Sequence, residues 1–386
     1  MTIRQLTDDE FEQAFQLSCY AFQVNDPEEL RPSAHLSWNE ATCYGDVSNG
    51  EVLAKLDLLP FHVDIHGKSM QMGGIAGVAS YPEQRRKGLV KQLIVHTLKE
   101  MRVKGQLLSY LAPFEVGFYR KFGWEMAFDE TTFTLEPIQL PKPNPLLEGQ
   151  IERVPFSDKR IRTIYKNQQR HGMLIREEWW WKSLERKYSK HYTAIYTDQS
   201  GTAIAYIVYQ VKNRQFETDE LLYTEPAGLA ALLSFIGQHD SMIDSAEITT
   251  PSSDSLNYFL PDPKTKAEIV PYFMTRIVDV QAFLVEFPFL NSEGGNYTLQ
   301  IEDSFAEWNN KIFSLNLNSG NVSCEVITNM EAPSIKMSIQ TLTGLMLGYR
   351  RPSFYIKQGL IKGDTKEIEF FVRHIPYEAP ALVDFF

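Results

Sequence analysis

The apolar residues in the first part of the chain switch between the spacing of strands and the spacing of helices. The segment Glu51–Leu58 follows the turn Ser48-Asn49-Gly50, a pattern typical of a β-hairpin. A glycine-spaced strand is predicted at Ser69–Ala79. From Leu89 to Val103 apolar side chains recur at helical spacing, and Leu107–Leu111 is predicted as a short buried strand. This order of elements indicates an α/β fold.

The middle of the chain repeats part of this order more weakly. Tyr192–Tyr196 and Thr202–Gln210 flank a glycine turn and predict a hairpin, which a helix from Pro226 to Ile236 and a strand at Ala246–Thr249 follow. The similarity lies in the order of elements and not in the residues. The last part mixes strands with one helix, predicted at Tyr297–Ile301, Lys311–Leu317, Val322–Ile327 and Ser338–Tyr349.

Two places divide the chain. Four prolines fall within the nine residues from Pro137 to Pro145. Because proline lacks an amide donor and fixes φ, this stretch predicts a semi-rigid connector. Val270–Ile277 has the pattern of a last strand, after which a new segment opens at Val278. We therefore expect three domains, at residues 1–148, 149–277 and 278–386.

The composition is that of a globular protein. Of 386 residues, 43% are hydrophobic and 23% are charged, which excludes collagen-like and disordered classes. The formal net charge of −11 disfavours broad nucleic-acid binding and suits cationic partners. No apolar run approaches the roughly 20 residues that a membrane span needs. The polar, acidic start does not resemble a signal peptide, so a cytoplasmic protein is expected.

The three cysteines, Cys19, Cys43 and Cys324, lie far apart and form no Cys-x-x-Cys pair. An odd number without that spacing indicates neither a disulfide framework nor a zinc site, and no metal is expected. We interpret the three residues as small, buried, apolar side chains.

The stretch that indicates chemistry is Gly77–Val90. A strand is predicted to end at Ala79, the basic residues Arg85–Lys87 follow, and an amphipathic helix begins at about Gly88. The backbone amides of such a loop, with the positive end of the helix dipole, form an anion site. Basic side chains lie unfavourably at a helix N-terminus unless an anion binds there, so we expect a ligand that carries a pyrophosphate. Neither a Walker A loop nor a dinucleotide-binding glycine motif is present.

The basic loop resembles the acetyl-CoA loop of the GCN5-related N-acetyltransferases (GNAT), whose pattern is Gln/Arg-x-x-Gly-x-Gly/Ala. Here the loop is Arg85–Val90, with Val90 where Gly or Ala is usual. Its longer form, Pro-x-x-Arg-Arg-x-Gly-Leu, resembles one branch, the enhanced intracellular survival (Eis) proteins, which are bacterial aminoglycoside and lysine acetyltransferases. Two further segments resemble signatures of that branch, Tyr119-Arg120-Lys121-Phe122-Gly123-Trp124 and the aromatic end Asp384-Phe385-Phe386.

The resemblance covers the whole chain and implies two GNAT-like domains in tandem, the second degenerate, followed by a sterol-carrier-like α+β domain. It also implies acetyl-CoA as co-substrate and a homohexameric assembly. The pantetheine arm would pair as a pseudo-strand with the amides of Val78, Ala79 and Ser80. The family match assigns the pyrophosphate to Arg86, Lys87, Gly88, Leu89, Val90 and Lys91, and further CoA contacts to Phe114 and Glu115.

Acetyl transfer needs an amine that has lost its proton, and the departing thiolate gains from a proton donor. The resemblance assigns the general acid to Tyr119, which the residues alone would place as a packing aromatic beside Phe118 and Phe122. It assigns the base to the free C-terminal carboxylate, here that of Phe386. An apolar end such as Val383–Phe386 is expected to pack and not to fray. Candidates for lining an acidic acceptor pocket are Asp26, Trp38 and Asp384.

Three functions stay open from the sequence. The leading hypothesis is an acetyl-CoA-dependent N-acetyltransferase that acts on polycationic amines such as aminoglycosides. The second is acetylation of protein lysines, for which the same site would serve and the width of the pocket would decide. The third is a lipid- or ligand-carrying protein with a vestigial acetyltransferase domain, which the intact Arg85–Gly88 loop and Tyr119 argue against.

Overall fold

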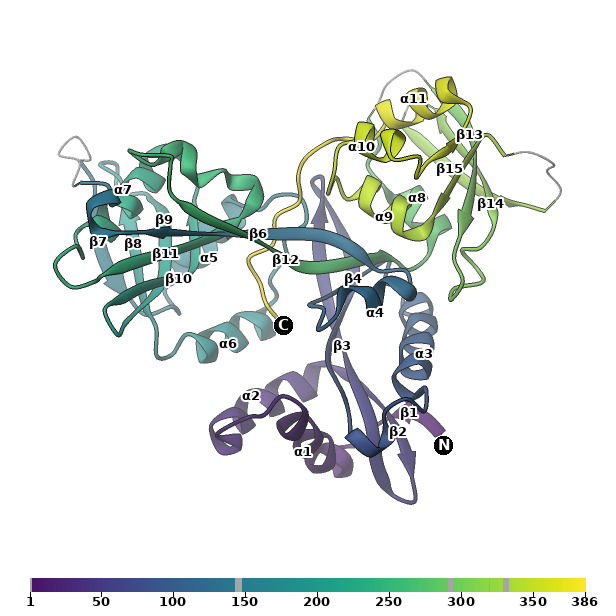
Figure 1. The fold of residues 1–386 in the computed structure, drawn as a ribbon, viewed down its shortest axis with the longest axis horizontal. Coiled ribbons are helices and arrows are strands. Elements are labelled where there is room, and N and C mark those ends of the chain that lie inside the picture. The colour runs from purple at the N-terminus through teal and green to yellow at the C-terminus, as the bar shows by residue number, and fades with distance from the viewer. Residues whose placement is uncertain (1, 143–147, 291–293, 319, 329–332) are drawn as a thin grey trace. The chain divides into compact units, whose positions relative to one another are not determined.

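In the computed structural model the chain divides into two compact units, and Figure 1 labels most of their helices and strands. The first comprises Met1–Ala127, Tyr272–Pro380 and Asp384–Phe386, and the second comprises Phe128–Pro271 and Ala381–Val383. The structure describes all residues except 1, 143–147, 291–293, 319 and 329–332. The end of the expected proline connector, residues 143–145, lies outside the described residues.

The first unit begins with a mixed sheet and the helices on its faces. Its elements are β1 (Thr2–Gln5), η1 (Asp8–Glu10), α1 (Phe11–Ala21), α2 (Pro27–Glu40), β2 (Thr42–Ser48), β3 (Glu51–Ile65), β4 (Lys68–Ser80), η2 (Pro82–Gln84), α3 (Leu89–Val103), β5 (Leu108–Leu111), α4 (Val116–Lys121) and the end of β12 (Lys266–Ile277). The strand order is β1-β2-β3-β4-β5-β12, and only β4 and β5 run parallel.

Helices α1 and α3 cover opposite faces of this sheet. Successive residues of a strand point to opposite faces. Cys43 of β2 lies in one apolar cluster with Leu17 of α1, whereas its neighbour Tyr44 lies in another with Leu93 of α3. The expected helix at Leu89–Val103 and the hairpin turn at residues 48–50 are confirmed. All three cysteines are buried, as expected.

The first unit also contains the C-terminal part of the chain. Its elements are α8 (Val280–Glu286), β13 (Gly295–Glu302), β14 (Ile312–Asn318), β15 (Asn321–Ile327), β16 (Ile335–Ser338), α9 (Ile339–Met346), α10 (Pro352–Lys357), β17 (Lys362–Gly363) and α11 (Thr365–Arg373). The strand order is β15-β14-β13-β16-β17, with β13 and β16 parallel. The side chains of Met337, Leu342, Leu345 and Met346 are buried core residues.

The second unit also consists of a mixed sheet with helices packed on it. Its elements are β7 (Gln150–Val154), α5 (Lys159–Asn167), α6 (Glu178–Lys187), β8 (Tyr192–Thr197), β9 (Ala203–Lys212), β10 (Gln215–Tyr223), α7 (Pro226–Gly237), β11 (Ser245–Pro251), η4 (Ser252–Asp254), η5 (Leu256–Phe259) and most of β6 (Glu125–Leu135), with η3 (Pro137–Gln139) after it. The strand order is β6-β11-β10-β9-β8-β7, and β10 and β11 run parallel. Helix α7 and the apolar faces of β9 and β11 contribute to one core cluster of this unit.

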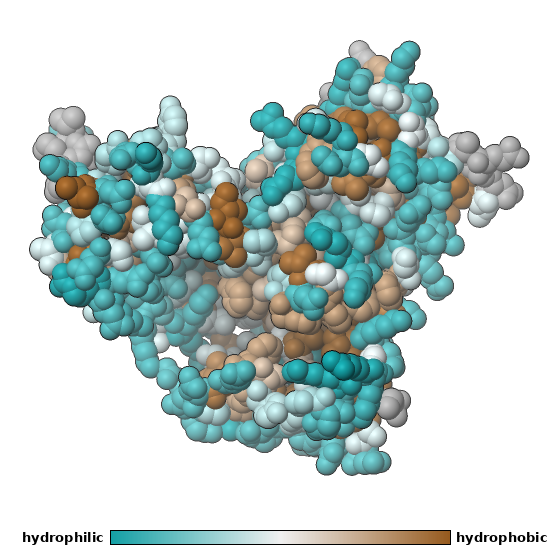
Figure 2. All heavy atoms as spheres, viewed as in Figure 1, coloured by the Kyte–Doolittle hydropathy of each residue, from teal (hydrophilic) through white to brown (hydrophobic). Residues whose placement is uncertain are grey.

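Each unit uses a strand that follows the other repeat in sequence. Met274–Ile277 of β12 pair with β5 in the first unit, and Glu130–Leu135 of β6 pair with β11 in the second. A compact unit therefore does not correspond to one continuous stretch of chain. On the face drawn in Figure 2, hydrophilic residues cover most of the surface. Within the part of the chain that the structure describes, no helix is long and apolar enough to cross a membrane.

Candidate active site

Strand β4 changes its pairing along its length. On one side it pairs with β5 from Met72 to Gly74, where Gly74 lies opposite Tyr110. On the other side it stays paired with β3 as far as Ser80, across a bulge at which Gly77 adopts a φ of +56°. Beyond Gly74 the strand therefore presents an edge that β5 has left. Val78, Ala79 and Ser80 lie on this last stretch, where an extended ligand can pair with the backbone as a further strand.

The loop after β4 prepares the N-terminus of α3 for an anion. Gly88 is the N-cap residue with a φ of +81°, and Arg86 also has a positive φ, of +63°. A Cβ on Gly88 would meet nothing closer than the Gln92 side chain at 4.0 Å, so glycine serves the backbone conformation and not a lack of space. The first helical hydrogen bond runs from the Gln92 amide to the Gly88 carbonyl, at 3.0 Å. The amides of residues 89–91 precede it and point out of the helix end.

Residues 85–88 of this loop are exposed to solvent, so the positive side chains surround an accessible helix end. The ammonium group of Lys87 donates to the Gln84 side chain at 2.8 Å. An open strand edge, a left-handed glycine and free helical amides next to basic side chains fit a pantetheine arm and a pyrophosphate. The residues present therefore fit acetyl-CoA.

Tyr119 lies on α4, in an aromatic cluster. Its side chain is 2% exposed, and ring centroids of Phe114, Phe118 and Trp124 lie 5.3, 5.2 and 6.5 Å from its own. Burial raises the pKa of the Tyr119 phenol above its usual range. The phenol therefore keeps its proton at neutral pH and has one to donate. Glu115 is the N-cap residue of α4 and Phe114 is 68% exposed.

The last three residues of the chain pack on β4 and β12. The Phe386 ring lies 4.8 Å from that of Phe61 and 5.0 Å from that of Phe273. The Tyr272 hydroxyl donates to the main-chain carbonyl of Asp384 at 3.0 Å, and the Asp384 side chain is buried. Phe385, by contrast, is half exposed. The expectation that this apolar end packs is confirmed.

The two remaining predicted residues lie in the α1–α2 region and have local partners there. Asp26 is the N-cap residue of α2 and accepts a hydrogen bond from the Glu29 amide at 3.1 Å. The Trp38 indole donates to the Asp8 carboxylate at 3.1 Å and meets Phe11 edge to face. Strand β4 contacts both proposed proton-transfer residues. Its Gly74 lies directly under the Phe386 ring, and its Val78 packs against the cluster that includes Tyr119.

The residues that hold the C-terminal end of α4 are not among those predicted from the sequence. Arg276 of β12 is fully buried, forms an ion pair with Asp303, and lies over the ring of Trp124. Gly123, at a φ of +94°, has no room for a side chain because a Cβ would meet the Arg276 guanidinium at 2.0 Å. The Gln340 amide group donates to the Arg120 carbonyl at 2.9 Å. A charged residue inside the apolar run of residues 272–278 was the signal available in the sequence.

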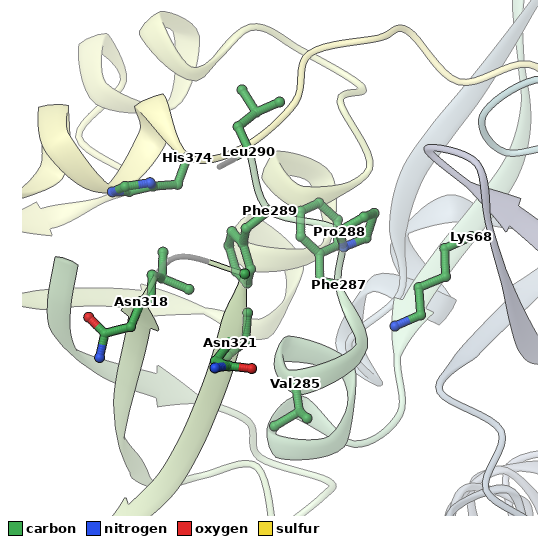
Figure 3. Close-up of a pocket in the computed structure, with 12 residues that line it drawn as sticks. Lys68, Val285, Phe287, Pro288, Phe289, Leu290, Asn318, Asn321 and His374 are labelled. Carbon is green, nitrogen blue, oxygen red and sulfur yellow. The ribbon is translucent and has the colours of Figure 1, made fainter. Parts of the chain in front are cut away.

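A separate cavity of about 230 Å³ lies in the C-terminal part (Figure 3). Phe287 and Phe289 lie side by side in it, with ring centroids 4.9 Å apart, and Lys68 and His374 are on its rim. None of the predicted site residues lines it. Among the described residues, no group of three or more His, Cys, Asp or Glu side chains could hold a metal ion.

Comparisons with known proteins agree with this architecture. Residues 2–127 and again 172–277 match the acetyltransferase (GNAT) domain family, and residues 280–383 match the sterol carrier protein domain. A crystal structure from Enterococcus faecalis V583, described as a conserved protein of unknown function and probable N-acyltransferase, is 30% identical with a TM-score of 0.94. That match covers 100% of this chain and 99% of the other.

Two further relatives are more distant. The crystal structure of Eis1 from Mycobacterium abscessus is 20% identical, with a TM-score of 0.80 and full coverage of both chains, and so shares the fold. An uncharacterized N-acetyltransferase of Streptomyces avermitilis is 23% identical over 270 residues, which are 62% of this chain and 64% of that relative's length. Taken with the end-to-end match to the Enterococcus protein, these findings mean that the chain belongs to the GNAT family of N-acetyltransferases, in the Eis-like form of two GNAT domains followed by a sterol carrier protein domain.

Proposed function

We propose that this chain transfers the acetyl group of acetyl-CoA to amines of polycationic small molecules such as aminoglycosides. The observation that carries the proposal is the opened edge of β4 followed by the left-handed Gly88 at the N-terminus of α3. The GNAT fold implies the use of acetyl-CoA. The formal net charge of −11 supports a cationic acceptor.

Acetyl-CoA would supply the activated thioester, and this chain would hold it in three places. The backbone of Val78–Ser80 would pair with the pantetheine arm. The amides of Gly88–Lys91, with the side chains of Arg86 and Lys87, would bind the pyrophosphate. Phe114 and Glu115 would add contacts at the start of α4.

Two proton transfers are needed, one to the departing thiolate and one from the attacking amine. Tyr119 would donate its phenolic proton to the departing thiolate, because a phenol is protonated at neutral pH and burial of Tyr119 keeps it so. The carboxylate of Phe386 would accept the proton of the attacking amine. Asp26, Trp38 and Asp384 are our proposed residues for the acceptor pocket.

The same site would serve acetylation of protein lysines, which is the second candidate. We also propose a homohexamer, which the family resemblance supports, and no nucleic-acid partner, which the formal net charge of −11 supports. A cytoplasmic location and domain boundaries at residues 1–148, 149–277 and 278–386 are further proposals. For the third candidate, a carrier protein, the supporting feature is the cavity of Figure 3, whose lining mixes apolar and polar side chains. Its lining includes Lys68, whose ammonium is already paired with Glu286 at 2.6 Å, so an anionic headgroup would have to compete with that carboxylate.

The proposal is tested by measuring release of free thiol from acetyl-CoA in the presence of aminoglycosides, linear polyamines and lysine peptides. We expect release with aminoglycosides and a mass increase of the acceptor by one acetyl group for each amine modified. Release with lysine peptides alone would move the assignment to the second candidate. Absence of release with every amine, while acetyl-CoA still binds, would contradict both.

A further inference from the structure

We propose that Gly74 is a positioning residue. The Phe386 ring packs in the space that a side chain at position 74 would occupy, and this packing determines where the Phe386 carboxyl group lies. The inference rests on the proposed role of that carboxylate as base. It begins with a close approach. A Cβ built on Gly74 would lie 2.7 Å from Cε2 of Phe386 and 2.9 Å from two ring carbons of Phe61.

The need for glycine at this position concerns space and not backbone conformation. Gly74 is an ordinary strand residue, paired with Leu59 of β3 and with Tyr110 of β5. Its φ angle is not positive. Alanine is therefore compatible with the backbone at this position, and the atoms that it would meet are the ends of side chains.

The Phe386 ring cannot avoid an added methyl group by simply turning aside. The rings of Phe61 and Phe273 enclose it, with centroids 4.8 and 5.0 Å away. The chain two residues earlier is held by the hydrogen bond from the Tyr272 hydroxyl to the Asp384 carbonyl at 3.0 Å. The Phe61 ring has to give by a few tenths of an ångström, and the rest of the relief comes from movement of residues 385–386, which carries the carboxyl group along.

The place of this contact gives it a consequence for catalysis. Gly74 is the last residue of β4 that pairs with β5, so the ring is seated where the two strands part. The edge that would receive the pantetheine arm begins just beyond. A general base displaced by about 1 Å at such a point can lower the rate by about 10²-fold.

The test is a size exchange between the two residues. In Gly74→Ala we expect kcat to fall on the order of 10²-fold while the Kd for acetyl-CoA changes little, since the pyrophosphate site lies on a different segment. In Gly74→Ala/Phe386→Leu, the smaller side chain restores space, and kcat should recover by roughly tenfold or more relative to Gly74→Ala. Phe386→Leu alone should be slower than wild type, because its seat is then too large. If Gly74 only stabilised the fold, kcat would not fall in each single variant and recover in the double variant.

The neighbouring glycine is a matched control. A Cβ on Gly73 would meet Leu58 and Gln106 at 2.8 Å, a clash of the same size on the opposite face of the strand. Gly73→Ala should lower the melting temperature, and Phe386→Leu should not rescue it. If Gly74→Ala does not fold, Phe386→Leu and Phe386→Trp at unchanged Gly74 give the same reading, with lower kcat at unchanged acetyl-CoA affinity.

The outcomes separate this inference from the proposed function. Wild-type kcat in Gly74→Ala, or a loss that Phe386→Leu does not reverse, would overturn the role of Gly74. Blocking the carboxyl group by a C-terminal extension tests the base itself. If the extended enzyme keeps full turnover, the proposed base is wrong, whatever the result at Gly74. If the extended enzyme is inactive and Gly74→Ala is fully active, only the positioning role is wrong.

Discussion

The two GNAT repeats differ most where a strand leads into the central helix. In the first, residues 81–88 separate β4 from α3, and this connection contains three basic side chains and ends at the left-handed Gly88. In the second, only Thr224 and Glu225 separate β10 from α7. The N-cap residue there is the acidic Glu225, and Pro226 at the first helical position has no amide proton. Both repeats keep the parallel strand pair, β4–β5 and β10–β11.

The sheet alone therefore does not make an anion site. A helix N-terminus binds a phosphate when its amides are accessible and positive side chains surround it. The start of helix α7 is exposed but has no basic side chain, and Pro226 removes one amide donor, although the helix is more apolar and at least as well packed as α3. The core of the second repeat can be maintained without the loop, because burial of apolar side chains stabilises the fold without any ligand.

The segments that follow β5 in the first repeat and β11 in the second also differ. Tyr119 follows β5 and is 2% exposed within an aromatic cluster, whereas Tyr258 follows β11 and is 83% exposed. We predict that Tyr119→Phe lowers kcat by about 10²–10⁴-fold, the usual contribution of a general acid, with the Kd for acetyl-CoA nearly unchanged. Steady-state kinetics and calorimetry would measure the two quantities.

Tyr258→Phe is the matched control for this prediction, and its kcat should equal that of wild type. A rate of Tyr119→Phe within twofold of wild type would return Tyr119 to a packing role. In that case the aromatic cluster would explain its burial completely.

The second prediction concerns the number of acetyl-CoA molecules bound by one chain. We expect one, in the first repeat. Arg86→Ala with Gly88→Glu should weaken binding by roughly 10²–10³-fold, since a hydrogen bond to a charged group contributes about 1.5–3 kcal/mol and the new carboxylate opposes the pyrophosphate. Glu225→Ala in the second repeat should change neither affinity nor stoichiometry. Titration calorimetry that gives two sites per chain would contradict the comparison.

Much of this difference could be predicted from the sequence, because it lies in local patterns. The basic residues 85–87 and the glycine after them predict the anion site, and the apolar periodicity of 89–103 predicted helix α3 with the observed bounds. Helix α2 was missed because none of its residues is buried and Pro32 interrupts it, so no apolar period marks it. The seating of Phe386 on Gly74 was also missed, since it joins residues more than 300 positions apart.

The exchange of the strands β6 and β12 could not be predicted either. Pairing of Met274–Ile277 with β5 joins segments more than 160 residues apart, and strand propensity alone does not choose a partner strand. Arg276 is the residue that fits only one place, because its guanidinium needs Asp303 and the space left by Gly123.

The third prediction tests whether the chain end serves the first repeat. Residues 384–386 belong to the first compact unit. Appending a short C-terminal tag converts the Phe386 carboxylate into a neutral amide, so activity should fall by about 10²-fold or more, the scale for loss of a general base. Acetyl-CoA affinity should be kept, because its site is on β4 and α3. Full turnover by an intact tagged enzyme, verified by mass spectrometry, would be incompatible with the assignment.

The smallest expected effect concerns the hairpin tips of the two repeats. Both turns have two residues with positive φ, His66-Gly67 in the first and Asn213-Arg214 in the second. The His66 side chain is 7% exposed, donates to the Met346 carbonyl and lies 3.8 Å from the Glu378 carboxylate. Burial lowers the pKa of His66 to about 4, although the hydrogen bond opposes the shift. The tip of the first hairpin is thus held by its surroundings, whereas Asn213 is exposed.

A histidine whose pKa is lower in the folded than in the unfolded protein costs stability in acid. The unfolded chain takes up the proton first, so the contribution of neutral His66 is complete above about pH 6.5 and declines as the pH falls towards 4. By pH 5 the loss should be roughly 2 kcal/mol, at about 1.4 kcal/mol per pH unit. We therefore expect the melting temperature of wild type to fall more between pH 7.5 and 5 than that of His66→Asn, in which asparagine tolerates the positive φ. Asn213→His places an exposed imidazole at the corresponding turn and should add no pH dependence. Equal pH dependence of wild type and His66→Asn would mean that the first hairpin tip is no more constrained than the second.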